Sequence, residues 1–370
     1  MKLGVVRAYM LKEFKDLVRS RMLSLVYLLP TMIIILFGYG IRMDVTHARA
    51  LIIDRDQTPL SRDLTSHFMH SKYFDTTLAA VSEREALDRI KQAREDLLIL
   101  IPSGFERDVL HGTGSEIAVF IDGAFPVRAE TISNYVRGTL FSATSGLLLP
   151  QRLKMIRLDN RNLFNQAMRD ENAIVPGLLG LILLVAPAIL AALLIVKEKE
   201  EGTIFNFYSS GLKKSEFLVA KLTPVFLLHS INIFILFLWA TWLFKVPFRG
   251  SFTLFWGASE LYILASLGVG LLVSIVTRTQ IVAIVLTIIL TIIPGFLYSG
   301  MLMPISSMSA ESKIEAHLYP VMYYNHIVYD TFLVGQGLAS TRNLLYLFIL
   351  GLYAFALIFL GAILLKKELR

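Results

Sequence analysis

Residues 172–196 read NAIVPGLLGLILLVAPAILAALLIV, a run of 25 positions without a charged side chain. A membrane-spanning helix needs about 20 predominantly apolar residues. Comparable charge-free stretches are Met22–Ile41, Leu222–Phe244, Thr279–Ala310 and Asn343–Leu365, and a further stretch, Gly250–Thr277, is interrupted only by Glu260. The sequence therefore predicts a membrane protein that is all-α in the membrane, with six transmembrane helices.

The composition agrees with this class. Of 370 residues, 55% are hydrophobic and 18% are charged, whereas soluble domains carry about 25% charged residues. The net charge of +7 does not indicate a nucleic-acid partner, because the basic excess lies in segments that flank the spans. The chain has no cysteine, which excludes disulfides and thiolate metal sites.

The distribution of Lys and Arg predicts the orientation in a bacterial inner membrane. Segments 1–21, 197–221, 278 and 366–370 hold 15 basic residues, whereas the loops 245–249 and 311–342 hold 4. Cytoplasmic loops are the ones enriched in Lys and Arg. We therefore expect both termini to be cytoplasmic and residues 42–171 to be extracytoplasmic.

Two segments outside the spans have recognisable patterns. Residues 1–21 have an apolar face at helical spacing and are expected to form an amphipathic helix at the cytoplasmic interface. Residues 42–171 alternate short apolar runs with amphipathic segments, which predicts an inserted α/β domain between spans 1 and 2. Its expected strands are Ala50–Ile53, Phe74–Ala79, Asp96–Ile101 and Glu116–Ile121, its expected helices are Leu60–His70, Glu83–Ala93 and Ser103–Leu110, and residues 126–168 are expected to be helical.

The segment between the second and third spans carries the most specific motif. Residues 197–203 are KEKEEGT, and Leu212, Phe217 and Lys221 follow. This arrangement resembles the signature of ABC type-2 exporter permeases. Val175-Pro176-Gly177 and the segment from Ser299-Gly300 to Pro304 resemble other parts of the same family, in the subgroup with a large extracytoplasmic domain between spans 1 and 2.

The resemblance implies that the loop 197–221 enters a short coupling helix that docks into a separate ATPase. Gly202 would permit a sharp turn, the glutamates would supply acidic contacts, and the aromatic residues would supply apolar anchors. The implied ATPase-coupling residues are Glu198, Glu200, Glu201, Gly202, Thr203, Phe205, Phe207, Tyr208 and Lys221. The alternative interpretation is an ordinary solvated connecting loop.

The energy source is expected to be another subunit. No stretch matches the phosphate-binding G-x-x-x-x-G-K-[ST] pattern. We therefore expect a transport permease that is not an enzyme and binds no cofactor itself. ATP and Mg are expected to bind to the partner ATPase. Six spans are too few for an enclosed path, so we expect a dimer with a second copy or a paralogous permease. Some members of this family are associated with a periplasmic adaptor protein, which is therefore a further candidate partner.

Candidate pathway residues are Glu260, His229, Tyr323 and Tyr324. A carboxylate inside a span is costly unless it meets water, a partner charge or an interface, so Glu260 is either a pathway residue or a structural one. The aromatic residues belong to 300–334, expected to be an outer re-entrant segment. They form either an exit gate or an interfacial aromatic belt.

Two other classes remain as alternatives. A secondary transporter would show internal repeats, but the long insertion after the first span has no later counterpart. A membrane-anchored envelope sensor or scaffold would not need five clustered spans after its domain. The expected cargo of the exporter is a drug, lipid, glycan or peptide.

Overall fold

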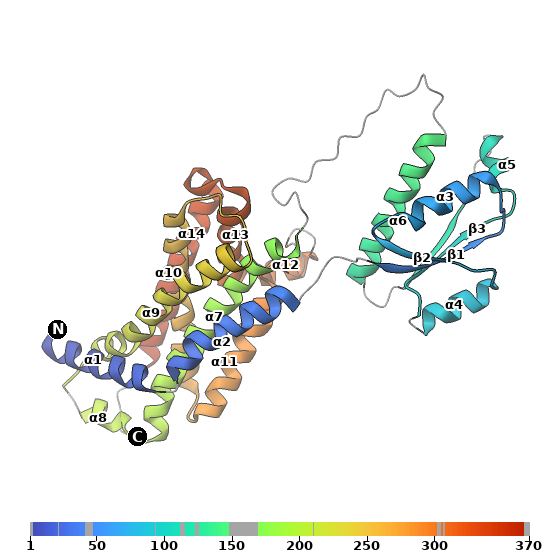
Figure 1. Ribbon diagram of the computed structural model, residues 1–370. Coiled ribbons are helices and arrows are strands. Elements are labelled where there is room, and N and C mark those ends of the chain that lie inside the picture. Colours follow the sequence, from blue (N-terminus) through green and yellow to red (C-terminus); the bar gives the residue numbers. More distant parts are fainter. Residues whose placement is uncertain are drawn as a thin grey trace. The chain divides into compact units, whose positions relative to one another are not determined.

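The computed structural model describes residues 3–365, except 21, 41–46, 93, 112–114, 123–125, 148–168, 210, 302–304 and 306–307. The chain divides into two compact units (Figure 1). A helical unit contains residues 1–41 and 162–370, and an α/β unit contains residues 42–161.

The helical unit is built from long apolar helices. Its elements are α1 (Leu3–Arg19), α2 (Met22–Gly40), α7 (Asp170–Glu200), α8 (Ile204–Ser209), α9 (Lys214–Leu238) with the π-helical turn η2 (Trp239–Leu243), α10 (Phe252–Val276), α11 (Gln280–Leu297), α12 (Ala310–His317), α13 (Pro320–Tyr329) with the π-helical turn η4 (Asp330–Val334), the 3₁₀ turn η5 (Gly337–Ala339) and α14 (Thr341–Leu364). Among the described residues, five helices are long and apolar enough to cross a membrane: α7, α9 with η2, α10, α11 and α14. The first expected span corresponds to α2, whose apolar part over Val26–Gly40 is shorter.

Helix α7 is the central helix of this unit. It packs against α2, α9, α10, α11 and α13, and nearly all of its apolar side chains are buried. The contacts with α10 are close, because a Cβ on Gly270 would lie 2.2 Å from the Ala188 carbonyl oxygen. Tyr262 and Ser266 of α10 donate hydrogen bonds to the Gly180 and Leu184 carbonyls of α7 at 2.9 and 2.5 Å. Small residues and such hydrogen bonds hold membrane helices together without a hydrophobic driving force.

Two of the breaks predicted for the apolar stretch 279–310 are absent. This stretch is too long for one span, and Pro294, Gly295, Gly300 and Pro304 predict breaks in it. Helix α11 instead continues through Pro294 and Gly295 to Leu297. Membrane helices tolerate proline because neighbouring groups satisfy the freed carbonyl. The predicted break at Gly300 is confirmed, because the chain turns there with a φ of 74° after the end of α11. Pro304 lies outside the described residues.

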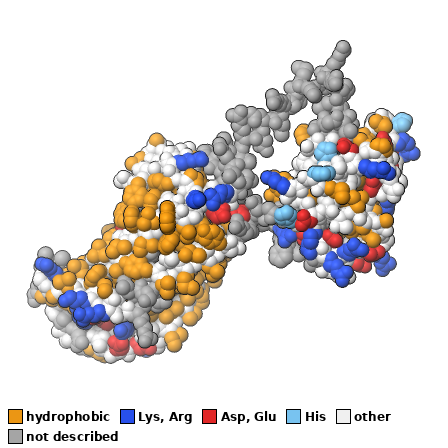
Figure 2. Space-filling view, viewed as in Figure 1, with side chains coloured by type: hydrophobic (Ala, Val, Ile, Leu, Met, Phe, Trp, Pro, Cys, Tyr) orange, Lys and Arg blue, Asp and Glu red, His pale blue; other side chains and the backbone are white. Residues whose placement is uncertain are grey.

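The surface of the helical unit matches its composition. Figure 2 shows hydrophobic side chains over the middle of its visible face, with Lys and Arg near the ends. Exposed apolar residues are concentrated on α11 and α14, including Ile281, Val285, Phe348 and Phe355. Such a band indicates contact with lipid or with another membrane protein.

The α/β unit contains the secondary structure expected from its sequence. Its elements are β1 (Ala48–Asp54), α3 (Pro59–Met69), β2 (Phe74–Leu78), α4 (Glu83–Lys91), β3 (Leu97–Ile101), α5 (Phe105–Leu110), β4 (Ala118–Ile121) and α6 (Pro126–Leu147). The sheet has the order β2-β1-β3-β4; β1 is parallel to β2 and β3, and β4 is antiparallel to β3. The expected helix over 126–168 is confirmed as far as Leu147, and residues 148–168 lie outside the described part.

Helices cover both faces of this sheet (Figure 1). Alternate β1 residues Ala50 and Ile52 pack with α3, α5 and α6, whereas Leu51 and Ile53 pack with α4. One buried acid, Asp96, accepts hydrogen bonds from the Arg49 backbone at 2.9 Å and its side chain at 3.2 Å. Burial disfavours the ionised form of Asp96, but Arg49 and Arg128 outweigh that effect and hold the pKa of the carboxyl below its usual value.

Candidate functional site

The end of α7 differs from the expected loop. Residues 197–200 continue the helix, which ends with Glu201 as its C-cap. Gly202 follows with a φ of 73°, the left-handed conformation that commonly terminates helices. Because α9 already begins at Lys214, the connection between the two helices spans residues 201–213 rather than 197–221, and α8 lies within it.

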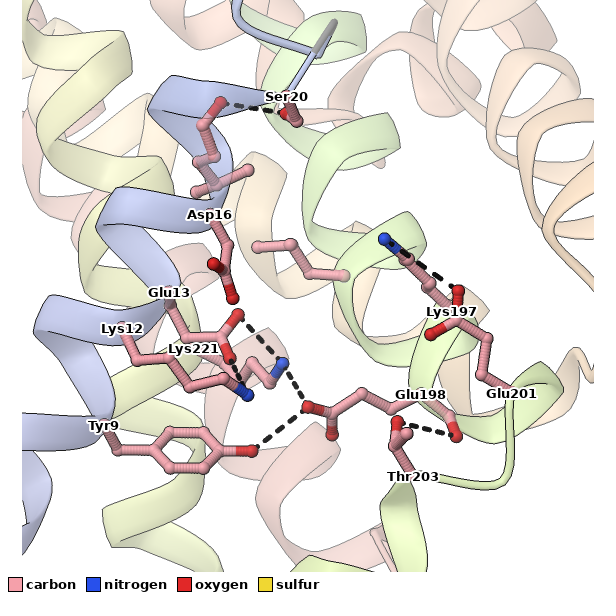
Figure 3. Close-up of a pocket in the computed structure, with 12 residues that line it drawn as sticks. Tyr9, Lys12, Glu13, Asp16, Ser20, Lys197, Glu198, Glu201, Thr203 and Lys221 are labelled. Carbon is pink, nitrogen blue, oxygen red and sulfur yellow. Dashed lines mark hydrogen bonds and ion pairs between the residues drawn. The ribbon is translucent and has the colours of Figure 1, made fainter.

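Lys221 lies between two carboxylates (Figure 3). Its Nζ is 2.9 Å from Glu13 Oε2 and 2.5 Å from Glu198 Oε1. The Tyr9 hydroxyl donates to Glu198 Oε1 at 3.0 Å. The side chains of Lys221, Glu13 and Glu198 are only 3%, 5% and 11% exposed. We call Tyr9, Glu13, Glu198 and Lys221 the Lys221 cluster; it connects α1, α7 and α9.

The electrostatics of the Lys221 cluster favour a rigid junction. Burial, followed by the charge of Glu198 and the hydrogen bond to it, raises the pKa of Tyr9, so the phenol stays protonated as a donor. Removing one partner of a buried ion pair leaves an uncompensated charge and is strongly destabilising. The cluster therefore holds α1 against the ends of α7 and α9.

A cavity of about 240 Å³ opens beside the cluster. The Lys221 cluster, Lys12, Asp16, Lys197 and Thr203 contribute to its lining. Charges of both signs meet here, and the described residues contain no group of three or more His, Asp or Glu side chains suited to a metal ion. The geometry supports a structural junction between the helices.

Helix α8 has a buried face and an exposed one. Ile204 and Phe207 are buried, and the Phe207 ring stacks on Phe217 of α9 with centroids 4.0 Å apart. Phe205 is 51% exposed. Phe207 thus fixes α8 to its own chain, contrary to its expected role as an anchor in a partner. Phe205 has the exposure such an anchor needs, and the Tyr208 side chain lies outside the described part.

Two neighbouring residues bind the α10–α11 connection. Lys199 Nζ donates to the carbonyl of Ser274, and also to Thr277 O at 3.4 Å. Glu200 Oε2 accepts hydrogen bonds from the backbone and side-chain nitrogens of Gln280, both at 3.0 Å. A cation at a helix C-terminus and an anion at a helix N-terminus are favourable. The end of α7 is therefore joined to α10 and α11 as well as to α1 and α9.

Comparison with known proteins decides the family. The family described as "ABC-2 family transporter protein" matches residues 20–363. The chain belongs to this family. It is 28% identical over 370 residues to "Probable multidrug ABC transporter permease YbhS" of Escherichia coli, covering 99% of this chain and 97% of the relative. It is 25% identical over 340 residues to "Probable multidrug ABC transporter permease YbhR" of Escherichia coli, covering 90% and 91%.

The family match confirms the resemblance to ABC type-2 permeases that the KEKEEGT motif at residues 197–203 indicated. The chain is an ABC transporter permease with membrane-spanning helices. A third relative, "Inner membrane transport permease YhhJ" of Escherichia coli, is 24% identical over 263 residues, covering 70% of this chain and 69% of the relative.

The expected pathway residues of this ABC-2 permease each have their own hydrogen-bond partner within the chain. Glu260 is half-buried and accepts a hydrogen bond from Ser230 at 2.8 Å. His229 is fully buried and its Nδ1 lies 2.9 Å from the Val225 carbonyl oxygen.

The two tyrosines also face the interior of their own chain. Tyr324 is buried, bonded to Ser259 at 2.8 Å and stacked on Tyr262. The Tyr323 hydroxyl donates to the His317 carbonyl at 2.9 Å. Of the four candidates, Glu260 alone retains appreciable exposure.

Sequence reasoning missed Tyr9 and Glu13. Glu13 had a detectable signal, because Val6, Met10, Glu13 and Leu17 follow helical spacing and place the carboxylate on the apolar face of α1. An acid in that position requires a buried cation. Tyr9 had no such signal, since a tyrosine is ordinary on an interfacial helix.

Proposed function

We propose that the chain is the membrane-spanning subunit of an ATP-driven exporter, with α8 as the element that receives motion from a separate ATPase. The single observation that carries this role is the junction at the end of α7. Short α8 follows a left-handed turn at Gly202 and presents Phe205 outward. A force on α8 would reach four other helices through Lys199, Glu200 and the Lys221 cluster.

The proposed topology has six spans, with α2 as the first. The basic residues of 1–21 and 197–221 support a cytoplasmic location for both termini and α8. Residues 42–171 then project from the opposite side as an extracytoplasmic domain. The compact α/β unit, with its own two apolar clusters, suits an independent domain.

The proposed assembly is a dimer with two ATPase subunits. Mg and ATP bind to the ATPase, and the second permease is either the same chain or a paralogue. The broad exposed apolar faces of α11 and α14 leave room for such a partner in the membrane. A periplasmic adaptor that contacts residues 42–171 is a further part of this proposal.

The proposed cargo is a drug, lipid, glycan or peptide. The relatives' description as multidrug permeases favours a drug-like molecule. Within the path we retain Glu260 as a candidate contact for cargo, because it remains partly exposed in a span. A carboxylate inside a span is retained against a cost of about 2.5–3.5 kcal/mol at mid-helix.

Two phenylalanines of α8 test the coupling role. Phe205→Ala should weaken binding of the ATPase by at least about fivefold, since interface aromatics commonly contribute over 1 kcal/mol. It should leave thermal stability unchanged. Phe207→Ala should instead lower stability by about 3–5 kcal/mol, because a buried ring is lost. Co-purification of the ATPase and thermal unfolding are measured on the same preparations.

Val276→Ala provides a matched control, because Val276 is 72% exposed at the end of α10 but is not part of α8. It should bind the ATPase normally. If Phe205→Ala binds the ATPase and exports as well as the unmodified chain, α8 is only a connector and the coupling proposal fails.

A further inference from the structure

A second cavity lies at the other end of the helical unit from the Lys221 cluster along α7. It has a volume of about 470 Å³ and is bordered by α12, α13 and the first turn of α14. Tyr329, one of its lining residues, donates a hydrogen bond to the Ala173 carbonyl in the first turn of α7 at 2.6 Å. The cavity is therefore remote from α8 and the proposed ATPase contact.

Its lining is basic. Lys313, His317, His326 and Arg342 border the cavity, and no carboxylate is among the described lining residues. In the sequence, residues 301–307, which follow Gly300, contain no acidic residue. An opening with two permanent cations and two imidazoles attracts anions.

Two carboxylates on the elements that border the cavity already have hydrogen-bond donors. Asp330 Oδ2 accepts hydrogen bonds from the Gly337 backbone at 2.9 Å and from Asn343 Nδ2 at 2.7 Å. Glu315 accepts a hydrogen bond from Tyr298 at 2.5 Å. Neither carboxylate forms an ion pair with Lys313 or Arg342 among the described residues.

The two permanent cations have no side-chain partner in the described part of the chain, neither an ion pair nor a hydrogen bond. Arg342 is also in the first turn of α14, where the helix dipole disfavours a cation. Burial and the charge of Arg342 lower the pKa of His326, with Asp330 acting in the opposite direction. The groups around the cavity therefore repel one another, and a bound anion would relieve that repulsion.

We propose that this cavity binds a phosphate group through Arg342 and Lys313, with His317 and His326 as additional donors. A guanidinium matches the oxygens of a phosphate in a two-pronged hydrogen bond, and an ammonium adds a point charge. Met322 and Ile305 give the cavity an apolar wall as well. The phosphate is supplied either by a phospholipid headgroup or by a free phosphorylated molecule.

The test measures binding to the purified full-length chain in a neutral detergent by isothermal titration calorimetry. One arm titrates inorganic phosphate, and the other titrates dihexanoyl phosphatidylglycerol. Arg342→Gln and Lys313→Gln should each weaken binding about tenfold, the loss expected for one charge-assisted hydrogen bond. Arg342→Lys should retain more affinity than Arg342→Gln because it keeps the charge.

Lys245→Gln is the matched control, because it removes one exposed cation that does not border the cavity. It should leave both affinities unchanged. If inorganic phosphate binds and Arg342→Gln weakens that binding, a free phosphate is sufficient to occupy the cavity. If only the lipid binds, the ligand is a phospholipid headgroup. If neither probe binds, or if Arg342→Gln and Lys313→Gln bind like Lys245→Gln, the proposal is wrong. Because no ATPase is present, this outcome is independent of the coupling proposal.

Discussion

Charged residues at the end of α7 each have a different partner. Glu198 binds Lys221, Lys199 binds the α10 carbonyls, and Glu200 binds Gln280. Only Lys197 and Glu201 form a loose, exposed pair at 3.9 Å. A run of alternating lysines and glutamates in the sequence therefore makes separate interactions with different helices.

The sequence could not supply these partners. Tyr9 and Glu198 are separated by 189 positions in the chain, and no spacing rule relates them. The family motif indicated that residues 197–203 matter, but it did not distinguish internal contacts from contacts with an ATPase. Burial makes that distinction, because Glu198 and Phe207 face inward while Phe205 is exposed.

Lys221→Met should be strongly destabilising. It would leave Glu13 and Glu198 buried without their cation, and losing one partner of a buried pair costs about 3–5 kcal/mol. The measurement is thermal unfolding of the full chain in detergent. Lys197→Met is the control, because its exposed pair with Glu201 should contribute only about 0–1 kcal/mol. Equal loss in both variants would contradict a special role for the Lys221 cluster.

At the scale of elements, periodicity located most segments but misplaced several ends. The four expected strands are present because each is a short apolar run bounded by turn residues. The ends of α7 and α9 were misplaced because charge was taken as the boundary of a span. Both helices extend beyond their apolar parts, since Lys199 and Lys221 have partners inside the protein.

Gly202 sets the direction of α8. Its φ of 73° is costly for other residues, although a Cβ there would meet no atom within 4 Å. Gly202→Val should therefore act through the backbone and not through a steric clash with neighbours, at a cost of about 1–2 kcal/mol or more. We expect normal insertion but weaker ATPase binding and lower coupled transport.

Gly202→Asn is the matched variant, because asparagine tolerates the left-handed region better than a β-branched residue. It should retain most of the coupling lost in Gly202→Val. Comparable export and ATPase stimulation in Gly202→Val and the unmodified chain would show that the turn does not matter for coupling.

For the whole molecule, composition and hydropathy predicted a membrane protein, and the family comparison confirmed this class. The cavity lined by Lys313 and Arg342 was not predicted, because these two residues entered the sequence analysis only as basic residues of the loop 311–342. Their convergence depends on how α12, α13 and α14 pack together. Tertiary packing thus adds the sites, whereas hydropathy identifies the spans.

The orientation of the whole chain can be tested directly, because the chain has no native cysteine. Thr77, Ser209 and Ala339 are exposed in the structure, so a cysteine at each can react with a thiol reagent. With both termini cytoplasmic, a membrane-impermeant maleimide should label Thr77→Cys and Ala339→Cys in spheroplasts, and Ser209→Cys only after lysis. The difference arises because the reagent cannot cross the bilayer, and lysis controls for the reactivity of each site. Labelling of Ser209→Cys in intact spheroplasts would place α8 outside. No cytoplasmic ATPase could then bind it, and the coupling role of Phe205 would fail together with the orientation.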